Sequence, residues 1–146
     1  MSGVIDTNLL LYGANADAPE HGAARRFLEA VGRTADPWYV TDGILYEFLR
    51  VSTHPKVFPQ PLTWGEALAF VAPLLEADNV YVLQAGDGHW ALLDEVLGGL
   101  VHPSGNLFFD VRTAVLMREH GVRRIYTTDA DFLQFAGIES INPLRA

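Results

Sequence analysis

The chain has 146 residues, of which 49% are hydrophobic and 19% charged, and its formal net charge is −8. This composition excludes a disordered protein and predicts one globular domain over residues 1–146, with a hydrophobic core of its own. Because there is no cysteine, disulfide bonds, zinc–thiolate sites and cysteine nucleophiles are excluded, and the acidic balance argues against bulk attraction to nucleic acid.

The first half of the chain alternates short apolar runs with helical spacing. In chain order it first predicts a strand at 4–5, then a helical turn around 9–11 that Asp6-Thr7-Asn8 caps, and then a helix over 23–31 that ends at Gly32. A strand at 38–40 comes next. Two helices follow: Asp42 caps the first, which stops before Pro55, and the second runs from Thr63 to Leu75.

The second half continues the same alternation. It predicts a strand at 80–83 and then a helix that Asp87 caps and that runs through Leu97. Asn106 caps the next helix, which runs through Met117 and ends at Gly121. Strands are predicted at 125–127 and at 140–141. Short apolar strands that alternate with helices predict an α/β fold with a parallel sheet of four to five strands, covered on both faces.

Four acidic residues stand where an acid is hard to explain by structure alone. Asp6 and Asp129 directly follow the first and fourth strands, so both lie at the carboxyl edge of the sheet, where ligands bind in such folds. Glu47 and Asp110 each interrupt the apolar stripe of a helix. Clustered carboxylates repel each other unless a cation lies among them, so the pattern predicts a site for a hard divalent ion and metal-assisted chemistry on phosphate.

Each acid also has a structural interpretation. Asp6 and Asp129 are placed to cap the turns that follow them, and Glu47 and Asp110 have Arg50 and Arg112 nearby as ion-pair partners. Either arginine is also suited to clamp a phosphate, although pairing with the acids is the favoured role of each. Two interior acids together with two edge acids make metal binding the better interpretation of the set.

Short polar side chains flank these acids. Thr127 is interpreted as a hydroxyl that orients a carboxylate, whereas Asn8 and Thr128 suit capping equally well. Asp131 is interpreted as a further acid with a secondary role at the site, or as a solvated turn residue.

Taken together, these motifs resemble the PIN-domain family, and more closely its VapC-type ribonuclease toxins of type II toxin–antitoxin systems. The motifs are Asp6-Thr7-Asn8, Glu47 in Glu-Phe-Leu-Arg, Asp110 in Gly-Asn-Leu-Phe-Phe-Asp, and Thr127-Thr128-Asp129-Ala130-Asp131-Phe132. The resemblance covers essentially the whole chain and implies a Rossmann-like fold and an endoribonuclease that depends on Mg²⁺ or Mn²⁺. It also implies a homodimer, an RNA substrate and a cognate VapB-type antitoxin that blocks the site. By the same match, Asp6, Glu47, Asp110 and Asp129 bind the metal, and Thr127 is the assisting hydroxyl.

Other functions were weighed against this one. A receiver domain needs a late lysine, but Lys56 is the only lysine, and an aspartate-nucleophile phosphatase needs an acid where Asn8 stands. A housekeeping PIN-domain nuclease for RNA processing and a non-catalytic RNA- or protein-binding PIN module remain alternatives, although the intact acids favour an enzyme. The start of the chain has no basic segment, and its longest apolar run, 67–75, is too short to span a bilayer, so a cytoplasmic location is expected.

Overall fold

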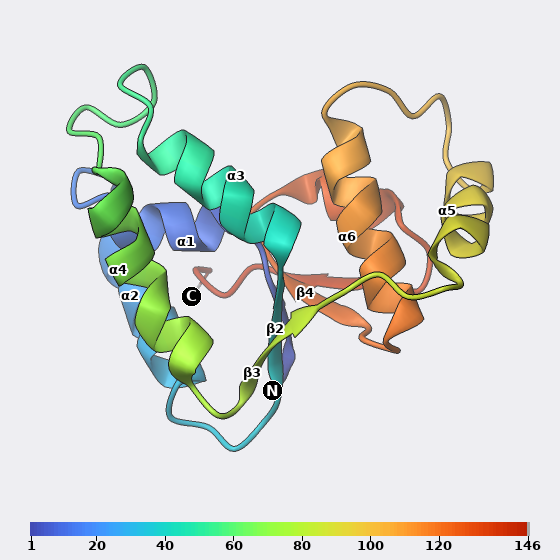
Figure 1. Cartoon of the computed structure of the whole chain (residues 1–146), viewed down its shortest axis with the longest axis horizontal. Coiled ribbons are helices and arrows are strands. Elements are labelled where there is room, and N and C mark those ends of the chain that lie inside the picture. The colour runs from blue at the N-terminus through green and yellow to red at the C-terminus, as the bar shows by residue number, and fades with distance from the viewer. Residues whose placement is uncertain (146) are drawn as a thin grey trace.

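The structure is a computed structural model that describes residues 1–145, and it is built around a five-stranded parallel sheet (Figure 1). The strands are β1 (Gly3–Ile5), β2 (Trp38–Thr41), β3 (Val80–Leu83), β4 (Arg124–Tyr126) and β5 (Glu139–Ile141). The helices are α1 (Thr7–Ala14), α2 (His21–Val31), α3 (Asp42–Ser52), α4 (Trp64–Glu76), α5 (His89–Gly98), α6 (Leu107–Glu119) and the 3₁₀ helix η1 (Ala130–Gln134). The predicted α/β class and parallel sheet are therefore confirmed, with five strands.

The strand order places a switch point in the middle of the sheet. The order is β3-β2-β1-β4-β5, so the chain builds outward from β1 through β3 and then returns to the other side of β1. In Figure 1, α1, α2 and α4 lie on one side of the strands, and α5 and α6 lie on the other. Where successive connections change side in this way, a crevice opens at the carboxyl ends of the two central strands, here β1 and β4.

The strands are continuous apolar runs in the sequence because they lie in the core. Val4 and Ile5 of β1 are fully buried, because helices cover both faces of the sheet. Phe27 of α2 packs on Trp38 and Tyr126, with ring centroids 5.6 and 5.5 Å away. This aromatic group ties α2 to β2 and to β4, the strand that precedes Thr127 and Asp129.

Two of the predicted helix caps, Asp42 and Asp87, are wrong, and the third, Asn106, directly precedes its helix but makes no side-chain capping bond. The helix assigned to an Asp42 cap instead begins at Asp42, and the buried Thr41 caps it by accepting a hydrogen bond from the Ile44 N–H at 3.0 Å. Neither Asp87 nor Asn106 makes a side-chain capping bond at the start of its helix, and Gly88 is the residue that precedes α5.

Two other predicted helix ends are confirmed. At α4, the Thr63 hydroxyl accepts from the Glu66 N–H at 3.1 Å, and the Glu66 carboxylate accepts from the Thr63 N–H at 3.0 Å. Beyond α6, Gly121 has a φ of 68°, which the absence of a side chain permits. No helix within residues 1–145 is both long enough and apolar enough to cross a membrane.

Candidate active site

Asp6 and Thr127 form the base of the site, directly after β1 and β4. The Thr127 hydroxyl donates to Asp6 Oδ2 at 2.7 Å, and the Thr7 N–H donates to Asp6 Oδ1 at 2.8 Å. The Asn8 amide donates to Asp6 Oδ2 at 3.2 Å and to Thr127 Oγ1 at 3.0 Å. With Asp6 only 7% exposed, its carboxylate is held in one orientation from both central strands.

The surroundings of Asp6 disfavour its charge. Burial raises the pKa of Asp6 to about 6, although the hydrogen bonds from Thr127 and Thr7 lower it. The negative charges of Glu47 and Asp129 raise it further. The hydrogen bond from Thr7 also makes Asp6 the cap of α1, so the capping interpretation describes one of its contacts and the acid cluster describes the rest.

Glu47 and Asp110 approach Asp6 from two different helices. One small cavity is lined by Asp6, by Glu47 of α3 and by Asp110 of α6. Burial raises the pKa of Asp110 to about 7, and the neighbouring acids, Asp6 first among them, add to the effect. Burial also raises the pKa of Glu47. The packing of α6 therefore brings its acid to the same edge as the strand-end acids.

The ion-pair interpretation does not hold for Asp110. The neighbouring Arg112 donates instead to Asp42 at the start of α3. The Arg50 charge lowers the pKa of Glu47, yet no ion pair in the part of the chain that the structure describes includes Arg50. Neither interior acid is therefore neutralised by a direct arginine contact.

A second and wider cavity, of about 450 Å³, carries the remaining acids. It shares Glu47 and Asp110 with the first cavity and adds Asp129 and Asp131. One oxygen each from Asp110, Asp129 and Asp131 lies within 4.8 Å of the others, a spacing that suits a shared cation. Asp129 also caps η1 through the Asp131 N–H at 2.9 Å, and its charge is the main cause that raises the pKa of Asp131.

The donor set fits a hard divalent cation. Every clustered group is a carboxylate, and oxygen ligands are those that Mg²⁺ prefers. A bound cation would also offset the repulsion that raises the pKa of Asp6 and Asp110. Asp131, for which only a secondary role was predicted, lies with Asp110 and Asp129 in one group of acids close enough to share a cation.

Comparisons with known proteins place the chain in a family. No model of a known protein family matches the chain. Ribonuclease VapC48 of Mycobacterium tuberculosis is 31% identical over 147 residues, which cover 98% of each chain. The chain belongs to the VapC ribonuclease family. Ribonuclease VapC33 of the same organism is 33% identical over 142 residues, which cover 96% of each chain.

Solved structures show the same fold. VapC20 of M. tuberculosis, a sarcin–ricin loop cleaving toxin, superposes with a TM-score of 0.67 at 19% identity, covering 94% of this chain and 98% of that one. VapBC2 of Rickettsia felis, bound to a DNA fragment from its promoter, gives a TM-score of 0.65 at 15% identity, covering 96% and 97%. The resemblance to VapC-type ribonucleases, and the fold it implied, are confirmed.

One residue beside the VapC acids was missed by the sequence reasoning. Phe109 lines both cavities and is 62% exposed, and no role was predicted for it. The signal available in the sequence is its helical position, since Leu107 and Val111 complete the inward face of α6 without it.

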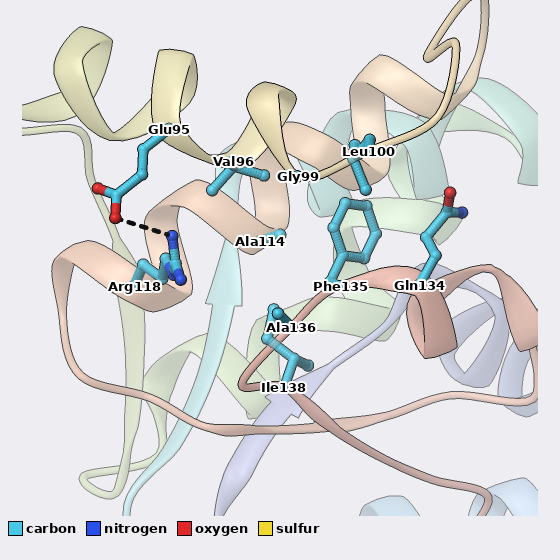
Figure 2. Close-up of a pocket in the computed structure, with 10 residues that line it drawn as sticks. All are labelled: Glu95, Val96, Gly99, Leu100, Ala114, Arg118, Gln134, Phe135, Ala136 and Ile138. Atoms are coloured by element: carbon cyan, nitrogen blue, oxygen red, sulfur yellow. Dashed lines mark ion pairs between the residues drawn. The ribbon is translucent and has the colours of Figure 1, made fainter.

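A separate cavity of about 60 Å³ lies between α5, α6 and the segment after η1 (Figure 2). Figure 2 shows Arg118 paired with Glu95 at 3.8 Å along its wall, with Phe135 and Leu100 facing the interior. None of the clustered acids lines this cavity, so it is separate from the candidate active site.

The hydrogen bond from Thr127 to Asp6 leads to a specific expectation. Thr127→Val keeps the shape of the side chain but removes the donor that holds the carboxylate, so cleavage of RNA should fall by about 10- to 100-fold, and more divalent cation should be needed for it. Thr53→Val is the matched control, because it removes a hydroxyl that bonds only backbone carbonyls of α3. Equal cleavage and equal Mg²⁺ dependence in both variants would contradict the role of Thr127.

Proposed function

We propose that this VapC-family protein is an endoribonuclease toxin that depends on Mg²⁺, with Mn²⁺ as a substitute. The observation that carries the proposal is the convergence of acids from β1, α3, α6 and the segment after β4 on two adjoining cavities. Burial and mutual repulsion raise the pKa of Asp6 to about 6 and of Asp110 to about 7, a cost that a divalent cation would offset.

In this proposal, some residues bind the cation and others orient the residues that bind it. Asp6, Glu47, Asp110, Asp129 and Asp131 would hold the cation. When bound, the ion lowers the pKa of a coordinated water and stabilises charge on the phosphate. Thr127 and Asn8 keep the Asp6 carboxylate oriented through their hydrogen bonds. Because Mg²⁺ retains several waters, an open acidic cavity suffices and a closed protein cage is not required.

Arg50 is the residue that we propose to contact the RNA substrate. It lines the wider cavity beside Glu47 and is exposed on α3, whereas Arg112 is paired with Asp42. A guanidinium makes two parallel hydrogen bonds to a phosphate, so we assign Arg50 to a phosphate of the RNA near the acids.

The proposed function predicts cleavage that depends strictly on metal. The purified protein, free of any antitoxin, should cut a structured RNA in millimolar Mg²⁺ or Mn²⁺ and should stop when EDTA is added in excess. Restoring Mg²⁺ should restore cutting, since removal of the ion only returns the acids to their repelling state. Cleavage that continues undiminished in EDTA would refute the proposal.

We also propose a cognate VapB-type antitoxin as partner, and the complex of R. felis VapBC2 supports it as a fold relative. A cluster of carboxylates on a chain of net charge −8 suits an arginine-bearing segment, which would make charge-assisted hydrogen bonds in place of the cation. A homodimer is part of the same proposal. Tyr81 and Val82 support it, because they are 53% and 38% exposed on the edge strand β3.

A housekeeping RNA-processing nuclease would use the same acids for the same chemistry, and the family membership favours the toxin. A non-catalytic binding module is disfavoured for a physical reason. Half-buried and mutually repelling carboxylates destabilise the fold, and a protein that only binds RNA gains nothing from them.

A further inference from the structure

Phe109 occupies an unusual place beside the acids. It precedes Asp110 in the first turn of α6 and lines both the cavity that holds Asp6 and the wider cavity that holds Asp129. Its side chain is 62% exposed, so the core gains little from it. The neighbouring Phe108 is also exposed, at 45%, but lines neither cavity. An aromatic face is therefore available where the substrate has to lie.

The charges around the site attract RNA only weakly, so an aromatic contact would add to the affinity. The chain carries a net charge of −8, and Arg50 and Arg112 are the only basic side chains that line the two acid cavities among the described residues. Arg112 is already paired with Asp42, which leaves Arg50 and the cation to attract phosphate. Bulk attraction to RNA is weak under these conditions, so affinity has to come from contacts that do not depend on charge.

We propose that Phe109 is a stacking platform for an unpaired base next to the scissile phosphate, and so a residue that positions the RNA for the proposed cleavage. This inference rests on the proposed function. Bases of an A-form helix are stacked on one another, and only an unpaired nucleotide presents a free face to an aromatic side chain. The Asn106 amide lines the same wider cavity, makes no capping bond, and offers a donor and an acceptor to the edge of that base.

The experiment measures steady-state cleavage of one RNA hairpin with a single-stranded loop, in Mg²⁺, by the whole chain. Phe109→Ala should raise KM by about 10- to 100-fold, the range expected for the loss of one stacked base, with kcat nearly unchanged. Phe109→Trp should restore KM, whereas Phe109→Leu should not, because leucine is apolar but has no aromatic face. Phe108→Ala is the matched control and should behave as the wild type.

A salt series separates stacking from charge. The slope of log(kcat/KM) against log[salt] should be the same in Phe109→Ala as in the wild type, and smaller by about 0.7 in Arg50→Gln, the change expected for one phosphate contact on a single strand. A duplex with the same sequence as the loop should be a poor substrate. Melting temperatures equal to that of the wild type are expected for all variants, because these side chains are exposed.

Several results would overturn the inference about Phe109 and leave the proposed nuclease function intact. They are an unchanged KM in Phe109→Ala with an active wild type, full rescue by leucine, an equal defect in Phe108→Ala, and equal cleavage of the duplex. A variant that cuts RNA normally but no longer binds antitoxin would show that Phe109 faces a protein. A wild type that cuts no RNA in Mg²⁺ would overturn the proposed function itself, and this inference with it.

Discussion

Asp110→Asn is expected to lose RNA cleavage by more than the roughly 100-fold that loss of an outer-shell partner causes, and yet to melt no lower than the wild type in EDTA. The amide removes one of the proposed cation ligands, which would account for the lost activity. It also removes a charge whose cost is recorded in the raised pKa of Asp110, about 7, caused first by burial and then by the acids around it. Activity and metal-free stability should therefore move in opposite directions.

The measurements are a cleavage assay in saturating Mg²⁺ and thermal melting at pH 8 in EDTA. Asp94→Asn is the control, because it makes the same chemical change on the exposed side of α5, away from both acid cavities. If Asp110→Asn melted several degrees below the wild type without metal, the carboxylate would have a structural partner, and the ion-pair interpretation would return.

The metal-free protein is also expected to become less stable as pH rises from about 5 to about 8. Asp6 and Asp110 have pKa values of about 6 and about 7 in the folded chain, against about 3.9 for an unfolded aspartate. Between these values the folded state binds more protons than the unfolded state, so the free energy of unfolding falls with rising pH. The loss should be complete somewhat above pH 7, where both groups are ionised in both states.

Urea unfolding at several pH values, with EDTA or with Mg²⁺, measures this effect. Mg²⁺ binds the ionised acids, so its stabilising effect should be largest at pH 8 and smallest at pH 5. Asp110→Asn should flatten the metal-free profile. Glu66 and Glu119 do not interfere, because their pKa values are lowered and their contributions change only below this range. Metal-free stability that rose between pH 5 and pH 8 would contradict the assignment of these acids.

The sequence predicted the strand-end acids well, for a simple reason. A side chain that follows a parallel strand has to lie at the carboxyl edge, whatever the rest of the fold does, and so Asp6 and Asp129 could be placed from chain order alone. Asp110 lies on a helix, and its position depends on how α6 packs across the sheet. Its membership of the cluster was therefore a hypothesis that only the packing could support.

Other features depended on contacts that no sequence pattern encodes. Arg112 seemed to belong to Asp110 because they are neighbours in the chain, but the approach of α3 to α6 gives it Asp42 instead. The cap of α3 was misplaced by one residue because β2 runs directly into the helix, leaving the buried Thr41 at the junction. The exposure of Phe109 is different, because the helical spacing of Leu107 and Val111 indicates it, whereas the apolar run alone does not.

The hydrogen bond between Thr127 and Asp6 joins residues that are 121 positions apart in the sequence. It requires β4 to pair with β1, which is the first strand of the chain. During synthesis, β1, β2 and β3 leave the ribosome before the segment that carries Thr127, Asp129 and Asp131. The acid cluster is therefore incomplete until late in translation. The site can therefore first assemble only when nearly the whole chain has left the ribosome, because β4 and the residues after it are among the last to be made.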